Sequence, residues 1–364
     1  MPRTFLQWLE LHAVPPPLPE PGWQEILSFW KGRRVAVVRQ AAYRGAYPAG
    51  PRQPWEKTVL SAFTHLGPFS FLADLGADYF VVRQTPDPET FRWRDKFLND
   101  PHPNVAFEGV EIWQREQEET GGLLNCGEIS WETYDFVVTL DVAVPTRIIR
   151  KTRKPIWAYY SVEAGGALQK DSLRCPVPGY HLFLNHCFRR HRARPLNRPH
   201  VVEFPFSFQS ASAWKQLARG LRREGSRKDV VTDKPTWSSI SHPHSFPGWR
   251  PCAGDAPEYV GLMSSRKYAV RTDPLPRWGN WSIEAAQAGC LFLGNPDSLA
   301  MPALLLPGLV VRNPQEAVEV VQRLEKNPDL FDSARHAQSL LADHLAFRRP
   351  LAELTAKFRK ILKP

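Results

Sequence analysis

Three ionisable side chains in this sequence lie at the ends of predicted strands: Asp141, Glu163 and His186. In parallel α/β sheets, ligands bind outside the carboxyl ends of the strands. Carboxylates and imidazoles at that edge can take up or release a proton. A structural role stays open for each of them: a helix cap for Asp141, a turn acid for Glu163 and a packed histidine for His186.

A fourth acid, Glu284, stands in a short stretch that predicts a capped helix, residues 277–295. Ser282 suits the N-cap, because its hydroxyl can accept a hydrogen bond from the free N–H groups of the first turn. Glu284 then falls in that turn, where the helix dipole favours a negative charge. Gly289 suits the left-handed position that ends a helix. The apolar run 290–293 predicts a buried parallel strand.

Strands and helices alternate through the first half of the chain. Short apolar runs predict strands at 35–38, 78–82, 104–110, 134–141, 155–162 and 181–188. Amphipathic or capped segments predict helices at 4–12, 23–30, 59–66, 88–98, 111–119 and 145–151. Apolar strands that alternate with helices indicate a parallel α/β sheet. We therefore predict an N-terminal Rossmann-like domain over residues 1–205, with the stretch 192–208, rich in arginine and proline, as the connection to the next domain.

A second series of strands and helices predicts a C-terminal Rossmann-like domain over residues 206–364. Its predicted elements are helices at 214–223, 255–267, 282–289, 313–326 and 328–347, strands at 268–270 and 290–293, and a long loop at 233–254. Leu351, Leu354, Phe358 and Ile361 share one face of a terminal helix, which we expect to pack back on the molecule. Two such domains joined by a linker predict a cleft between them, where ligands commonly bind.

The composition narrows the classes of partner. The 364 residues carry a net charge of +10, which favours nucleotides, nucleic acid or an acidic membrane surface without selecting among them. The five cysteines are scattered and lack a C-x-x-C pair, which favours a reducing compartment over a disulfide framework. The N-terminus lacks a signal-peptide pattern, and the apolar run 299–311 is too short to cross a bilayer. We expect a cytoplasmic protein, or one peripheral to the inner face of the membrane.

Several catalytic signatures are missing from the sequence. It contains no P-loop, no G-x-G-x-x-G after a strand and no G-x-S-x-G elbow. No Asp-x-Asp ends a strand, and the pair His242 and His244 has no third ligand nearby. We therefore expect neither a bound metal nor a cofactor.

The segment from about residue 258 to 354 resembles the C-terminal half of a GT-B glycosyltransferase. The likeness rests on the runs 259–268, 279–290 and 307–310, followed by the Asn313–Glu316 helix cap and two helices. It is similar in particular to the bacterial spore-coat (CgeB-like) glycosyltransferase branch. The likeness covers about a quarter of the chain, and the N-terminal half matches only in its alternation of strands and helices.

This resemblance implies a nucleotide-sugar donor bound by the C-terminal domain. The N–H groups at the start of the helix would hold phosphate oxygens, Glu284 would accept hydrogen bonds from the ribose hydroxyls, and basic residues would neutralise the diphosphate. The donor-binding residues are expected to be Arg266, Lys267, Arg271, Arg277, Gly279, Asn280, Trp281, Ser282 and Glu284. Many retaining GT-B enzymes carry another acid eight residues before the one that Glu284 matches, but Pro276 stands there, so the stereochemical outcome stays open.

The resemblance also implies that the N-terminal domain binds the acceptor. Glu163, Asp141 or His186 would activate the acceptor hydroxyl or steady the sugar cation. The expected activity is metal-independent transfer of a sugar from a nucleotide-sugar to a hydroxyl of a glycan, a lipid-linked acceptor or a nucleic acid. The alternative is a basic nucleic-acid-binding protein without catalysis, whose binding would depend on salt and would be insensitive to Glu284.

Overall fold

The computed structural model describes residues 5–11, 16–40, 78–82, 129–140, 144, 146–161, 179–186, 199–204, 228–232, 249–251, 263–273, 281–298 and 302–362. The chain divides into two compact units. The N-unit comprises residues 19–187, 195–204 and 350–364, and the C-unit comprises residues 1–18, 188–194 and 205–349. Residues 1–18 and 350–364 thus each belong to the unit that is formed mainly by the other half of the chain.

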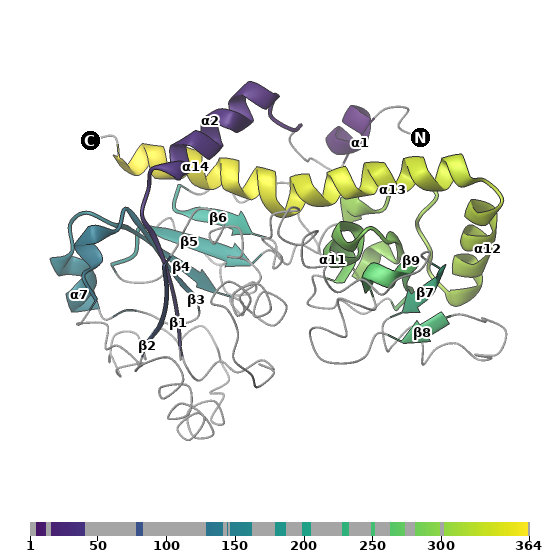
Figure 1. Cartoon of the computed structure of the whole chain (residues 1–364), viewed down its shortest axis with the longest axis horizontal. Helices are drawn as coiled ribbons and strands as arrows, with labels where there is room; N and C mark the ends of the chain where they lie inside the picture. Colours follow the sequence, from purple (N-terminus) through teal and green to yellow (C-terminus); the bar gives the residue numbers. More distant parts are fainter. Residues whose placement is uncertain are drawn as a thin grey trace, which may run out of the picture. The chain divides into compact units, whose positions relative to one another are not determined.

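The N-unit is built on a six-stranded parallel sheet in the order β2-β1-β3-β4-β5-β6 (Figure 1). Its strands are β1 (Val35–Gln40), β2 (Asp78–Val82), β3 (Phe136–Leu140), β4 (Ile156–Ser161), β5 (Leu182–His186) and β6 (Val201–Phe204). The first five confirm predicted strands. The connection predicted at 192–208 was wrong in part, because it contains β6, which pairs with β5 through Phe183 and Val201.

Two helices from opposite ends of the chain cover the N-unit together, α2 (Glu20–Lys31) and α14 (Arg349–Leu362) (Figure 1). Trp30 of α2 is fully buried, and its Nε1 donates to Thr355 Oγ1 of α14 at 2.8 Å. The rings of Phe136 and Phe358 pack against it at 5.3 Å between centroids. These contacts confirm that the terminal helix packs back, and they join α14 to the core of the N-unit.

The remaining described helical elements of the N-unit are short. They are η4 (Trp131–Thr133), which precedes β3, and α7 (Thr146–Lys151), which precedes β4. Trp131 and Ile149 anchor them in the same apolar cluster as Trp157 of β4. Both elements therefore lie against the sheet, with their charged residues exposed.

The C-unit is built on a four-stranded parallel sheet in the order β10-β9-β7-β8. Its strands are β7 (Lys228–Thr232), β8 (Trp249–Pro251), β9 (Arg266–Arg271) and β10 (Leu291–Gly294). The sequence predicted β9 and β10. It missed β7, and it missed β8 inside the predicted loop 233–254, since β8 is a three-residue edge strand that ends in proline.

The helices of the C-unit also combine both ends of its chain. They are α1 (Phe5–Leu11), α11 (Trp281–Ala288), α12 (Pro314–Glu325) and α13 (Pro328–Asp343), with the short turns η7 (Pro296–Ser298) and η8 (Pro302–Leu304). Trp8 Nε1 of α1 donates to the carbonyl of Ala303 at 2.8 Å, and Leu9 is buried in one cluster with Ile283 and Leu341. The first helix is therefore part of the C-unit core.

A buried glutamine covers the outer edge of β10. Gln338 of α13 accepts from Phe292 N at 2.6 Å and donates to Phe292 O at 2.8 Å and to Leu304 O at 2.9 Å. Further along, Gly294 N donates to Leu309 O and Gly294 O accepts from Val311 N. The side chain thus supplies the hydrogen bonds that a neighbouring strand would make, and the backbone groups of a buried edge need such partners.

A π-helical turn, η9 (His344–Arg348), joins α13 to α14. Pro350 follows it at the second position of α14. Proline has no N–H and clashes with the preceding turn of a regular helix, and a π turn is the wider insertion that accommodates such a break. The helix predicted at 328–347 and the terminal helix are therefore consecutive helical segments.

Two parallel sheets with covering helices confirm the predicted α/β class. In the described part of the chain, no helix combines the length and the apolar character that crossing a membrane requires.

Candidate functional site

The carboxyl edge of the C-unit sheet has the features of a ligand site. The strand order reverses between β7 and β9, and in open parallel sheets ligands bind outside the carboxyl ends of the strands at this point. Thr232 ends β7 and Arg271 ends β9, and both are buried. Arg271 is only 4% exposed, which is rare for a guanidinium. The positive charge of Arg271 is therefore buried at the carboxyl edge of the sheet, where a ligand is expected.

Helix α11 begins at the same edge. It connects the parallel strands β9 and β10, so its first residue lies on the carboxyl side of the sheet. All eight of its residues are buried, including Glu284, which is 4% exposed and stands in the first turn. The free N–H groups of a helix start attract anions, and an acid there is stabilised by the dipole. This edge thus combines anion-binding backbone groups, a buried carboxylate and a buried guanidinium.

The end of α11 confirms the prediction for Gly289, and its beginning corrects the prediction for Ser282. Gly289 has φ 87°, its N–H donates to Ala286 O at 3.1 Å, and Cys290 N donates to Ala285 O at 2.9 Å. This is the Schellman pattern that a left-handed residue permits. Ser282 is the second residue of the helix, not its N-cap, because helical geometry already includes Trp281.

Trp281 fixes the first turn of α11 against the sheet. Its ring meets Phe292 of β10 edge-on, with 5.6 Å between the centroids. Its Nε1 is buried and has no hydrogen-bond partner among the described residues. A buried donor without an acceptor costs about 1–3 kcal/mol, so this turn is held by apolar packing at some expense in free energy.

Asn295 organises the segment after β9, and the sequence did not single it out. Its backbone N–H donates to Arg271 O at 2.9 Å, and its Nδ2 donates to Thr272 O at 3.3 Å. Its Oδ1 accepts from Asp297 N at 3.0 Å. These bonds tie the carboxyl ends of β9 and β10 to each other. The only signal in the sequence was the Gly-Asn pair that ends the apolar strand.

Two predicted donor residues, Arg266 and Lys267, lie at the other end of β9. A strand rises about 3.3 Å per residue, which puts the Cα atoms of Arg266 and Arg271 roughly 16 Å apart. Arg266 Nη1 pairs with Asp229 Oδ2 at 2.8 Å, and Lys267 Nζ pairs with Glu325 Oε1 at 2.6 Å. These two cations therefore have acidic partners within the C-unit, at the amino edge of the sheet.

Lys267, Tyr268 and Glu325 form one polar cluster at this amino edge. Tyr268 OH donates to Glu325 Oε1 at 2.5 Å, and Lys267 Nζ lies 4.5 Å from the centroid of the Phe331 ring. Burial and the Glu325 carboxylate raise the pKa of Tyr268 far above its usual range. Burial alone would raise the pKa of Glu325, but the hydrogen bonds from Lys267 and Tyr268 lower it below its ordinary value. The phenol thus stays protonated and the acid stays charged.

The structure describes only part of the predicted site. Arg271, Trp281, Ser282 and Glu284 lie on the carboxyl side of the C-unit sheet, and Arg266 and Lys267 do not join them. Arg277, Gly279, Asn280, Asp141 and Glu163 lie outside the described residues. His186 ends β5, and only its backbone is described. No three His, Cys, Asp or Glu side chains within the described ranges are placed to hold a metal ion together.

Comparisons with known proteins return structures only. No family model matches the chain. No curated protein matches it either. Among solved structures, the trehalose-6-phosphate synthase OtsA is 11% identical, with a TM-score of 0.48 over 90% of this chain and 99% of that one. Sucrose-phosphate synthase from Thermosynechococcus elongatus is 12% identical, with a TM-score of 0.44 over 90% and 99%. Anabaena HepE in complex with UDP is 11% identical, with a TM-score of 0.37 over 90% and 100%. Similarities at this level do not define a family. The function of this chain is therefore inferred from its own residues.

Proposed function

We propose that this protein is a glycosyltransferase that moves a sugar from a nucleotide-sugar donor to an acceptor hydroxyl without a metal ion. One observation carries the proposal: a buried acid, Glu284, in the first turn of a helix that begins at the carboxyl edge of a parallel sheet. A nucleoside diphosphate presents both ribose hydroxyls and phosphate oxygens. The Glu284 carboxylate can accept hydrogen bonds from the ribose hydroxyls. The N–H groups at the start of the helix can donate hydrogen bonds to the phosphate oxygens.

Within the donor site, Glu284 accepts hydrogen bonds from the ribose hydroxyls. The N–H groups at the start of α11, with Gly279, Asn280, Trp281 and Ser282, hold the phosphates. Arg271 and Arg277 neutralise the diphosphate and stabilise it as the leaving group. Arg266 and Lys267 are paired with acids at the amino edge of the sheet, so we expect neither of them to contact the donor.

On the acceptor side, we propose that one of three residues transfers the proton or stabilises the sugar cation: Asp141, Glu163 or His186. β3 ends at Leu140 and β5 ends at His186 in a parallel sheet whose order reverses between β1 and β3. Residues that follow such strands are favoured positions for groups that contact a ligand. The acceptor hydroxyl would lose its proton as its oxygen bonds to the anomeric carbon, while the nucleoside diphosphate leaves.

We also propose that the reaction takes place in the cytoplasm. Cys290 is a buried thiol whose single S–H has two carbonyl oxygens in reach, with Sγ 3.0 Å from Met263 O and 3.4 Å from Arg266 O. A thiol that fills a structural position as a hydrogen-bond donor is compatible with a reducing compartment.

Titration calorimetry with UDP, GDP and ADP tests the donor site. Glu284→Gln preserves the size of the side chain and removes its charge. Loss of a hydrogen bond to a charged group costs about 1.5–3 kcal/mol, so we expect the Kd of the preferred nucleotide to rise roughly 10- to 150-fold. The three nucleotides also identify the base that the site prefers.

The matched control is Glu316→Gln. Glu316 is also a first-turn acid, but it belongs to the cap of α12, where its N–H donates to Asn313 Oδ1 at 2.9 Å. This control should leave nucleotide affinity unchanged. Equal affinity in Glu284→Gln and the parent protein would sink the assignment of the donor site.

A further inference from the structure

A dense group of basic residues lies at the amino edge of the N-unit sheet, where no site has been described so far. Five of the eight residues from 147 to 154 are basic, and none of the eight is acidic. They are Arg147, Arg150, Lys151, Arg153 and Lys154, and all five are exposed. We call them the α7 basic surface. They supply half of the net charge of +10 within about two turns of chain.

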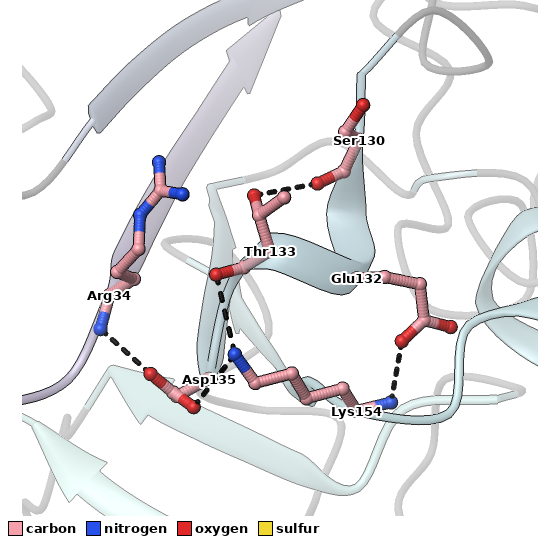
Figure 2. Close-up of polar contacts among 6 residues, drawn as sticks. All are labelled: Arg34, Ser130, Glu132, Thr133, Asp135 and Lys154. Atoms are coloured by element: carbon pink, nitrogen blue, oxygen red, sulfur yellow. Dashed lines mark hydrogen bonds and ion pairs between the residues drawn. The ribbon is translucent and has the colours of Figure 1, made fainter.

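Two acids lie beside this surface, and both are engaged with the chain itself (Figure 2). Glu132 Oε1 accepts from Arg153 N at 2.7 Å, and Glu132 Oε2 accepts from Lys154 N at 3.1 Å. Asp135 Oδ2 accepts from Arg34 N at 2.8 Å, and Asp135 Oδ1 pairs with Lys154 Nζ at 3.2 Å. Most of these bonds go to backbone N–H groups, so the acids hold the loops in place and neutralise only one side chain of the surface.

The other four cations remain directed to solvent. Within the described part of the chain, no side-chain ion pair is formed by Arg147, Arg150, Lys151 or Arg153. Figure 2 shows that the guanidinium of Arg34 also points away from Asp135, and it lies 4.8 Å from the ring centroid of Tyr134. The arrangement therefore presents several positive charges from neighbouring segments in the same region.

The polar network connects this surface to the strands beside it. Arg34 immediately precedes β1, Asp135 immediately precedes β3, and Lys154 stands two residues before β4. The bonds of Asp135 thus tie together the entries to three adjacent strands (Figure 2). Entries to parallel strands lie at the edge opposite the one where ligand sites form, so the surface is separate from the acceptor residues proposed above.

We propose that the α7 basic surface docks the protein on an anionic phospholipid membrane. Clusters of four to eight Lys and Arg residues bind acidic headgroups, and each contributes about fivefold in affinity, equivalent to about 1 kcal/mol. A membrane needs only an array of exposed point charges, because its headgroups move to meet them. Four unpaired cations on one short helix and the following turn meet that requirement.

A single-stranded nucleic acid fits the same residues less well. Proteins that hold single strands stack bases on exposed aromatic rings. The aromatic residues next to this surface, Trp131 and Tyr134, are 4% and 5% exposed, and their rings pack into the core. Docking through these side chains would be reversible and electrostatic.

Vesicle sedimentation tests the proposal with the full chain. We expect binding to equimolar phosphatidylglycerol and phosphatidylcholine vesicles and none to phosphatidylcholine alone. Binding should fall steeply as NaCl rises from about 0.1 M to about 1 M, because the Debye length shrinks from about 10 Å to about 3 Å. The variant Arg147→Gln/Arg153→Gln should weaken binding roughly 25-fold. Neither residue lies in the last turn of α7, where a basic side chain would support the helix dipole.

The matched control is Arg312→Gln/Lys326→Gln, which removes the same charge from exposed positions of the C-unit. It should bind vesicles like the parent protein, and circular dichroism should show that both variants are folded. Equal weakening by the control would assign binding to net charge alone and overturn the proposal. Absence of binding to the anionic vesicles would also overturn it, as would tight binding of duplex RNA or DNA through Arg147 and Arg153 without vesicle binding. Nucleotide affinity is measured separately, so these outcomes are independent of the glycosyltransferase assignment.

Discussion

In the C-unit, the cations at the amino edge of the sheet are held by acids: Arg266 by Asp229 and Lys267 by Glu325. In the N-unit, the acids at the corresponding edge bind mostly backbone N–H groups. Only Lys154 of the α7 basic surface has an acidic partner, and its other four cations face solvent. The same types of residue therefore serve opposite purposes at equivalent positions of two parallel sheets. The difference lies in what the acids bind, and it decides whether a cation is available to a partner.

The largest effect is expected where the C-unit acid is removed. Glu325→Ala deprives the Tyr268 OH and the Lys267 ammonium of their acceptor at once. A partly buried donor left unsatisfied costs about 1–3 kcal/mol, so we expect a loss of unfolding free energy in that range. Urea denaturation measures it, and hydrogen exchange should show weaker protection of β9. The control Glu325→Gln keeps an acceptor for Tyr268 and should cost less. If the two variants are equally stable, the phenol bond does not support the sheet.

The acid at the N-unit edge should have a smaller effect. Asp135→Ala removes the acceptor of Arg34 N and the partner of Lys154, both at positions reached by water. We expect a loss of about 1 kcal/mol in the free energy of unfolding. Vesicle binding should be retained or strengthened, because the variant removes a negative charge beside the α7 basic surface. A clear loss of vesicle affinity would mean that the network is needed to shape the surface, and that its acids do more than occupy backbone groups.

A histidine at the same edge makes the stability of the N-unit depend on pH. His181 Nδ1 accepts from Trp157 N at 3.0 Å, which requires the unprotonated ring nitrogen. Burial, with a smaller contribution from His200, lowers the pKa of His181. The unfolded chain then binds a proton at a higher pH than the folded chain does. This contribution to stability is complete above the unfolded value of about 6.5 and is lost as the pH falls through the folded pKa.

Urea titrations between about pH 5 and about pH 8 measure that slope. In His181→Asn the side chain no longer titrates, so the slope should flatten relative to the parent protein. His200→Gln is the control that keeps His181. A slope of the same size in His181→Asn would assign the pH dependence to another group.

The smallest effect is expected at the α7 basic surface itself. Arg147→Gln/Arg153→Gln should change the free energy of unfolding by no more than about 0.5 kcal/mol, as exposed substitutions away from structural contacts usually do. Lys267→Gln, the same kind of change at the C-unit edge, should cost more, since it leaves Glu325 without its cation. Denaturation of these variants in parallel sharpens the contrast between the two edges. Equal costs would show that the two sets of cations do not differ in structural role.

The local patterns in the sequence predicted much of the fold. β2 occupies the predicted residues 78–82, and Asn313 caps α12 as expected, because its Oδ1 accepts from Glu316 N. Such features depend on residues close together in the chain. The missed strands β6 and β8 are short, lie at sheet edges and gain their hydrogen bonds from β5 and β7. Their own residues carry too little pattern to identify them.

The site shows the same limit. The sequence predicted that Glu284 stands in the first turn of α11 and that Gly289 ends the helix, since both are local signals. It could not show that Arg266 and Lys267 are bonded to Asp229 and Glu325, which are remote in the chain. Asn295 escaped notice for the same reason, since its partners are the carbonyls of Arg271 and Thr272. Charge that looks available in a sequence can be compensated by tertiary contacts.

The contact between Trp30 and α14 has a consequence for synthesis. Trp30 is translated 325 residues before Thr355, which accepts its hydrogen bond, and Phe358 follows Thr355. Domains usually fold as units while the chain grows. The aromatic core of the N-unit instead cannot close until α14 has been translated. A product truncated before α14 would leave that core open to chaperones and proteases, so translation through α14 is a condition for a stable N-unit.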